Sequence, residues 1–207
     1  SSSLSQDTYT VTIHPTDAFG NKATSQITFT YDATAPPSPT VNTVSSPTNQ
    51  SSQTLTGTKS TDTVAITVTS STATIGTVTY PASTTWSVPV TGLKTGDNVI
   101  TVTAKDAASN TTSPVTATIV YDITPPAAPV VNAFTSPTKE STITLTGTKE
   151  VNSSILIGGV VKVALDTLDT WQSTYTLQSG SNTVSITSKD AAGNQSSAAT
   201  LTIIRDN

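Results

Sequence analysis

The stretch Tyr121–Pro126 reads Tyr-Asp-Ile-Thr-Pro-Pro, and it decides the organisation of the chain because copies of it recur at domain spacing. An earlier copy occupies Tyr31–Pro37, and Arg205 with Asp206 begins another. We call this stretch the joint. Its aspartates are separated by 122 minus 32, or 90, residues and by 206 minus 122, or 84, residues. A fixed period of this size indicates a tandem array of domains.

A second repeated segment, which we call the turn motif, recurs at nearly the same spacing as the joint. It reads Asp-Ala-Ala-Gly-Asn at Asp190–Asn194, and related copies stand at Asp106–Asn110 and Asp17–Asn21. The copies are separated by 106 minus 17, or 89, residues and by 190 minus 106, or 84, residues. The joint and the turn motif together predict a closing hairpin of an incomplete domain at residues 1–34. They also predict two complete domains, at residues 35–122 and 123–207.

The composition excludes several classes of function. Only 11% of the 207 residues are charged and the formal net charge is −4, so no basic face exists for nucleic acid. The chain contains no cysteine and no methionine, which rules out disulfides and thiolate sites. No apolar run approaches the roughly 18 residues of a membrane span, so we predict no membrane insertion in this segment.

The hydrophobic pattern is that of short strands. Tyr9, Val11 and Ile13 alternate with polar residues, and the same alternation follows Ile27. Each long repeat contains about seven such segments with turn residues between them and no helical period. We therefore predict an all-β fold of tandem immunoglobulin-like β-sandwiches, with one tryptophan in each core.

A family resemblance rests on five shared elements. They are a Thr-Gly-Thr strand, a Thr-Trp-Ser strand at Thr85–Ser87, a Gly-x-Asn corner, the turn motif and the joint. Together they resemble the bacterial immunoglobulin-like domains strung in tandem in large surface adhesins and biofilm-associated proteins. Ser109 and Ser60 depart from the pattern, in place of the turn glycine and of an acidic residue. The resemblance implies an extracellular stalk, commonly with calcium held between consecutive domains.

In the predicted sandwiches, many of the acidic residues lie near the joints. In a sandwich, the hairpin that leads into the last strand lies at the pole where the preceding joint arrives, so Asp122 should lie near Asp190 and Asn194. Carboxylates this close repel one another, and a hard cation that takes six to eight oxygen ligands would turn the repulsion into binding. We predict inter-domain calcium with this ligand set: Asp32, Asp62, Asp106, Asn110, Asp122, Glu150, Asp190 and Asn194.

Two other interpretations of these residues stay open. In the first, lysines at the same pole pair with the aspartates; the candidates are Lys59, Lys105, Lys149 and Lys189. In the second, the Asp and Asn side chains close tight turns through hydrogen bonds to the backbone.

We predict no enzyme, with no catalytic and no cofactor-binding residues. His14 is the single histidine and no nucleophile elbow accompanies the many serines. The predicted function is a structural repeat region of an extracellular bacterial cell-surface protein, forming a stalk for adhesion or biofilm formation. Its predicted partners are neighbouring repeats and, through other parts of the protein, a host-cell, glycan or neighbouring-cell surface.

Two alternative functions follow from the same residues. One is a subunit of an extracellular filament or sheath that self-assembles through the incomplete N-terminal domain. The other is a spacer or carbohydrate-binding module of a secreted enzyme. The latter needs a row of exposed aromatics, and only Tyr80 and Phe134 fall outside the predicted inward positions.

Overall fold

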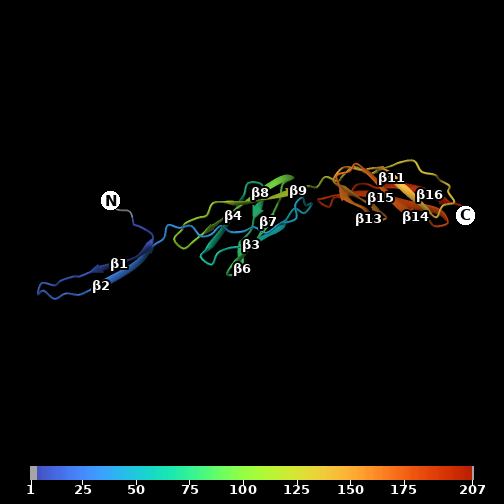
Figure 1. Cartoon of the computed structure of the whole chain (residues 1–207). Coiled ribbons are helices and arrows are strands. Elements are labelled where there is room, and N and C mark those ends of the chain that lie inside the picture. Colours follow the sequence, from blue (N-terminus) through green and yellow to red (C-terminus); the bar gives the residue numbers. More distant parts are fainter. Residues whose placement is uncertain (1–3, 207) are drawn as a thin grey trace. The chain divides into compact units, whose positions relative to one another are not determined.

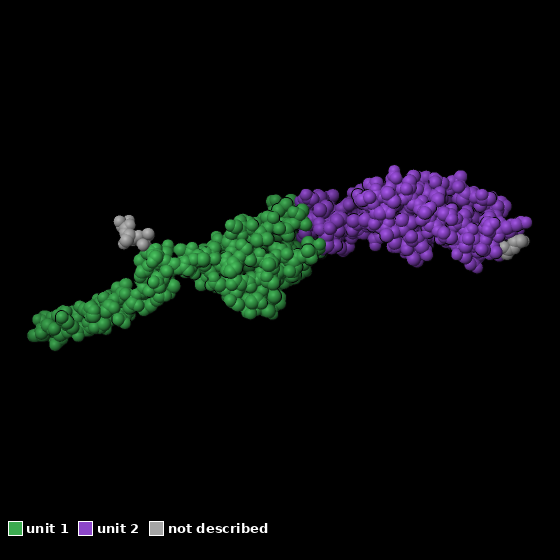
Figure 2. Space-filling model, viewed as in Figure 1, with its two compact units in different colours: residues 1–44, 52–92, 99–118 green, residues 45–51, 93–98, 119–207 purple. Residues whose placement is uncertain are grey.

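The computed structural model describes residues 4–206, and its regular secondary structure consists of β-strands throughout that range (Figure 1). The described chain divides into two compact units (Figure 2). One contains residues 4–44, 52–92 and 99–118, and the other contains residues 45–51, 93–98 and 119–206. The all-β prediction is confirmed; the domain boundaries at residues 34 and 122 stay a prediction.

The first element is an isolated antiparallel hairpin. Strands β1 (Asp7–Ile13) and β2 (Ser25–Tyr31) pair from Asp7 with Tyr31 to Ile13 with Ser25, and the turn motif lies in the loop that joins them. Tyr9 stacks on Phe29 with ring centroids 5.6 Å apart. Among the described residues no other strand pairs with this two-stranded sheet.

The first long repeat supplies seven strands in two sheets. One sheet contains β3 (Gln53–Thr58), β7 (Thr85–Thr91) and β5 (Thr74–Ile75), with β6 (Thr79–Ala82) also paired to β7. The other contains β4 (Ala65–Ser70), β8 (Gly96–Lys105) and β9 (Val115–Tyr121). Ile66 and Val68 of β4 are buried, whereas Val64 precedes β4 and is exposed.

The second long repeat also has seven strands, with one change of partner. Its first sheet contains β10 (Val130–Val131), β11 (Thr142–Thr148) and β14 (Thr170–Thr176). Its second sheet contains β13 (Val160–Asp166), β12 (Ser153–Ile157), β15 (Gly180–Asp190) and β16 (Ala199–Arg205). The strand between β12 and β14 therefore joins the second sheet, whereas β5 and β6 of the first repeat pair with the tryptophan strand β7.

The core of the second repeat gathers around Trp171. Leu145, Ile155, Ile186 and Ile203 are fully or almost fully buried with it. The Trp171 indole N–H donates to the backbone oxygens of Val130 and Thr148, so the polar end of the ring is satisfied inside the sheet. In the first repeat Trp86 is equally buried and donates to the backbone oxygen of Thr40.

The glycine of the Thr-Gly-Thr strand is required by this close approach. Gly147 pairs with Trp171, and Gly57 pairs with Trp86. A Cβ atom at Gly147 would overlap the backbone oxygen of Val130 and lie 2.8 Å from the Trp171 indole nitrogen. Any side chain there would force the Val130 backbone or the indole to shift.

Candidate functional site

The turn motif at Asp190–Asn194 is closed by hydrogen bonds to its own side chains. Asp190 Oδ1 accepts the backbone N–H groups of Gly193 at 2.7 Å and of Asn194 at 2.8 Å. Asp190 Oδ2 accepts the Asn194 side-chain amide at 2.9 Å. Gly193 has a φ of +98°, a conformation that glycine adopts without strain. The spacing of Asp and Asn in this motif is thus the spacing that a self-closed loop requires.

Asn194 also forms a hydrogen bond with the joint. Asn194 Nδ2 donates to the backbone oxygen of Asp122 at 2.9 Å, and Asp122 Oδ1 accepts the N–H of Thr124 at 2.9 Å. Asp122 and Asn194 belong to one compact unit. Their predicted proximity is confirmed, and the amide is the group that connects them.

The turn motif at Asp106–Asn110 forms the corresponding hydrogen bonds with the joint before it. Asn110 Nδ2 donates to the backbone oxygen of Asp32 at 3.1 Å and to Asp106 Oδ2 at 2.9 Å, while its N–H donates to Asp106 Oδ1 at 2.8 Å. Ser109 replaces the turn glycine yet keeps a positive φ of 75°. The departure in sequence therefore leaves the geometry of the turn unchanged.

Asp106 is buried, and its environment favours the ionised carboxylate. Burial raises the pKa of Asp106, but the hydrogen bonds from the side chain and backbone of Asn110 and from the backbone of Ala108 and Ser109 together bring it below the ordinary value of 3.8. Asp17 in the first hairpin has a lowered pKa as well, chiefly because the Asn21 side chain donates to it.

A cavity of about 490 Å³ with a mixed polar and apolar lining adjoins the second site. Asp122, Glu150 and Asp190 are among its polar lining residues, and Pro47 and Leu165 are among its apolar ones. Beside it, the backbone N–H of Asn49 donates to the oxygen of Ala192 at 3.1 Å within the same unit. The turn motif thus also bonds to a segment about 140 residues earlier in the chain.

The other predicted ligands lie on separate loops. Glu150 Oε2 accepts the backbone N–H of Ala127 at 2.9 Å, just after the joint. Asp62 lies on the exposed loop after β3, where its backbone N–H bonds to Ser60 Oγ at 3.2 Å. The structure therefore brings Asp122, Asp190 and Asn194 into direct bonding and places Asp62 on its own turn.

The donor chemistry of the site suits calcium. Carboxylate, amide and backbone oxygens are the ligands that calcium prefers. In residues 4–206, however, no three acidic or histidine side chains lie close enough to hold a metal ion. Both oxygens of Asp190 already accept hydrogen bonds. Calcium at the joints stays a prediction of the sequence.

One lysine pairs with an aspartate as the first open interpretation proposed. Lys149 Nζ lies 2.8 Å from Asp166 Oδ1 and donates to the oxygen of Leu168 at 2.7 Å; its side chain is fully buried. The Lys149 ammonium, with the Leu168 N–H, holds the pKa of Asp166 below 3.8. This is the one ion pair of residues 4–206. Lys59 instead donates to the oxygen of Thr63, and Lys105 and Lys189 are exposed.

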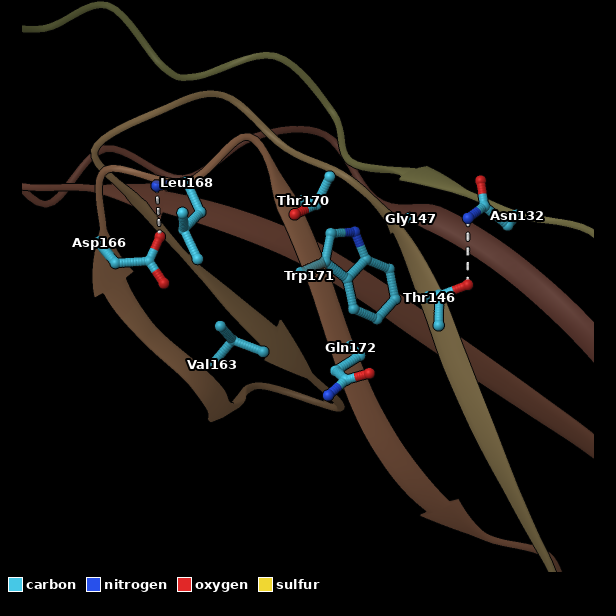
Figure 3. A pocket seen from close by; sticks show the side chains of 9 residues that line it. All are labelled: Asn132, Thr146, Gly147, Val163, Asp166, Leu168, Thr170, Trp171 and Gln172. Carbon is cyan, nitrogen blue, oxygen red and sulfur yellow. Dashed lines mark hydrogen bonds between the residues drawn. The ribbon is translucent and has the colours of Figure 1, made fainter.

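A groove of about 440 Å³ opens beside this ion pair (Figure 3). Figure 3 shows the Trp171 ring between β11 on one side and the Asp166 and Val163 side chains on the other. Leu168 and Gln172 also line it. Sequence reasoning did not predict this groove, because its lining depends on β13 pairing with β12 and not with β14.

Comparisons with known proteins establish the fold. No family model matches the sequence, and the search of curated proteins found no match. Fibronectin(III)-like modules of Clostridium thermocellum CbhA superpose with a TM-score of 0.50 at 12% identity, over 81% of this chain and 94% of theirs. This likeness shows an all-β sandwich fold.

Two further solved structures give weaker superpositions. The BSP domain of a biofilm-associated protein has a TM-score of 0.30 at 16% identity, over 82% of this chain and 29% of that chain. The adhesin InvE of Yersinia pseudotuberculosis has a TM-score of 0.32 at 16% identity, over 82% of this chain and 59% of that chain.

Proposed function

We propose that this chain is a structural repeat region of an extracellular bacterial surface protein, serving as a stalk for adhesion or biofilm formation. The observation that carries the proposal is the repeated bond between turn motif and joint. Asn110 holds the backbone of Asp32, and Asn194 holds the backbone of Asp122. A bond repeated at successive joints limits bending of the chain where it enters each sandwich, which is the property that a stalk needs.

The cores support a mechanical role. Each repeat buries one tryptophan against a glycine of the neighbouring strand. The paired strands lie far apart in the sequence and are joined by backbone hydrogen bonds. Sandwiches of this kind resist extension because many backbone bonds must break together. The two tryptophans do not serve the carbohydrate-binding alternative, because both lie inside the cores. Of the two aromatics that this alternative named, Phe134 packs on the core and Tyr80 is exposed.

The surface location is part of the proposal. In the described part of the chain no helix is long and apolar enough to cross a lipid bilayer. The function of the whole protein would then depend on parts that anchor the stalk and present its tip.

Single-molecule stretching of the full chain tests the proposal. We expect two unfolding events of similar size, since a repeat of about 85 residues at roughly 3.5 Å per residue releases on the order of 300 Å. Small-angle scattering of the same sample should give an elongated particle whose maximum dimension falls when Asn110 and Asn194 are both replaced by alanine. A compact particle, or a single unfolding event, would contradict a stalk.

A further inference from the structure

The chain enters its two sandwiches through matching segments, residues 35–39 and residues 125–129, which we call the entry segments. The Trp86 indole N–H donates to the backbone oxygen just after the first, and the Trp171 indole N–H donates to the one just after the second. The segments therefore correspond place by place, with an offset of 125 minus 35, or 90, residues. The prolines at the second and fifth places of each are buried, so burial does not distinguish the two segments.

The second entry segment is held by two side chains at Ala127. Glu150 Oε2 accepts the Ala127 backbone N–H at 2.9 Å, and Ser188 Oγ donates to the Ala127 backbone oxygen at 2.7 Å. Glu150 lies on the loop after β11, whereas Ser188 is fully buried in β15. Both backbone groups of one residue are thus fixed to the sandwich from two elements, and one of the two bonds is strengthened by a charge.

The first entry segment lacks the bond to a carboxylate. Pro37 holds the place of Ala127, and proline has no N–H to donate. Ser60 holds the place of Glu150, because each follows a Thr-Gly-Thr-Lys sequence. The Ser60 hydroxyl is used within its own loop, where Oγ accepts the backbone N–H of Asp62 at 3.2 Å. Donor and acceptor are therefore both absent at the first entry.

The first entry segment also lacks the buried hydroxyl. Ala104 holds the place of Ser188, since each lies two residues before a turn motif. Their surroundings agree: the Ala104 N–H donates to Thr112 Oγ1 at 3.0 Å, and the Ser188 N–H donates to Ser196 Oγ at 2.9 Å. Alanine has no group that could hold the Pro37 backbone oxygen. Three differences at distant places in the sequence thus remove one local arrangement together.

We propose that Glu150 and Ser188 form a latch that keeps the second entry segment on its sandwich, while the first entry segment detaches more often. The chain then has a built-in order of release, in which residues 35–39 leave their sandwich before residues 125–129 do. Local opening of this kind samples the weakest attachments first. The inference goes beyond the stalk function and does not depend on it, because local opening occurs in an unloaded chain.

Hydrogen exchange of the full chain, measured by nuclear magnetic resonance, tests this order. Asn42 and Asn132 are matched reporters just beyond the entry segments, and each follows a valine, so their intrinsic exchange rates agree. The Asn42 N–H donates to the Thr56 oxygen and the Asn132 N–H to the Thr146 oxygen, both at 2.8 Å. We expect Asn42 to exchange about tenfold faster than Asn132, since only the second segment has the bond to a charged group.

Two substitutions copy the first repeat into the second. The double variant Glu150→Ser and Ser188→Ala should bring the exchange rate of Asn132 up to that of Asn42. Glu150→Ser alone should also speed exchange of the Ala127 amide by about tenfold, because that amide loses its acceptor. Glu150→Gln keeps an oxygen acceptor and should have a smaller effect than Glu150→Ser.

Ser154→Ala is the matched control for the buried hydroxyl. Ser154 is buried in β12, and its Oγ donates to the Lys189 backbone oxygen at 3.1 Å without touching the entry segment. This variant should leave the exchange of Asn132 unchanged. Near-ultraviolet circular dichroism checks that Trp171 stays packed in every variant.

Three results would overturn the proposal. Equal exchange at Asn42 and Asn132 in the unaltered chain, which needs no variant, would show that no order of release exists. An Asn132 rate that the double variant leaves unchanged would show that Glu150 and Ser188 do not hold the segment. Equal effects of Ser154→Ala and Ser188→Ala would mean that the loss of any buried hydroxyl loosens the sheet.

Discussion

The side-chain amide of Asn194 lies 2.9 Å from the backbone oxygen of Asp122, which stands 72 residues earlier in the chain. The same amide bonds to the carboxylate of Asp190, so one side chain both closes the turn motif and holds the joint. The contact to Asp122 is made to its backbone, so it does not use the charge of that residue.

Asn194→Ala should therefore weaken two features at once. We expect a loss of about 2 kcal/mol in the free energy of unfolding, since a carboxylate oxygen and a carbonyl lose their donor. Urea denaturation followed by Trp171 fluorescence, in a chain with Trp86→Phe, measures it. Asn132→Ala removes an exposed amide bonded to Thr146 and should change the free energy by less than about 0.5 kcal/mol. Equal effects of the two variants would contradict a special role for Asn194.

Gly147→Ala tests the tryptophan packing. The added Cβ meets the backbone oxygen of Val130 and the Trp171 ring, so we expect a loss of about 3 kcal/mol or more. Gly180→Ala is the comparison: its Cβ meets nothing within 4 Å, and only the positive φ of +87° costs about 1 kcal/mol. Thermal melting recorded by near-ultraviolet circular dichroism separates them. A mild effect at Gly147 would mean that the indole can move aside.

The pH dependence of stability follows from Asp106 and Asp166. Both have a folded pKa below the ordinary 3.8, so their contribution is complete above that value and is lost as the pH falls through the folded pKa. We expect a flat melting temperature near neutral pH and a decline in acid. Asp166→Asn should lower the melting temperature at neutral pH and flatten part of the acid decline, because Lys149 loses its partner.

Asp169→Asn is the control for this pair. Its backbone oxygen accepts the Lys149 N–H, which the substitution keeps. If Asp166→Asn and Asp169→Asn give the same acid profile, the ion pair does not account for the decline.

Calcium binding at the joints leads to a separate prediction. If it binds as the sequence predicts, millimolar calcium should raise the melting temperature above that measured with a chelator, and the double variant Asp122→Asn and Asp190→Asn should remove the difference. Magnesium at the same concentration is the control for general ionic effects. Equal melting temperatures with calcium and with chelator would contradict the prediction and leave the hydrogen bonds as the force that holds each joint.

The strands and the core were predictable because both depend on local pattern. Alternation predicted one tryptophan in each core, and the burial of Trp86 and Trp171 confirms it. The repeat placed Asp122 beside Asn194, which is also confirmed. The pattern did not reveal that Asn194 would donate to both Asp190 and the joint, because the direction of an amide depends on which acceptors surround it.

The sequence by itself determined the repeat, the strands, the buried tryptophans and the meeting of turn motif with joint, since these follow from periodicity and spacing. Only the tertiary structure decided that β13 joins the sheet of β12 while β6 joins that of β7, and that Lys149 selects Asp166. The reason is physical: either sheet can accept such a strand locally, and the choice depends on which side chains the completed core leaves room for.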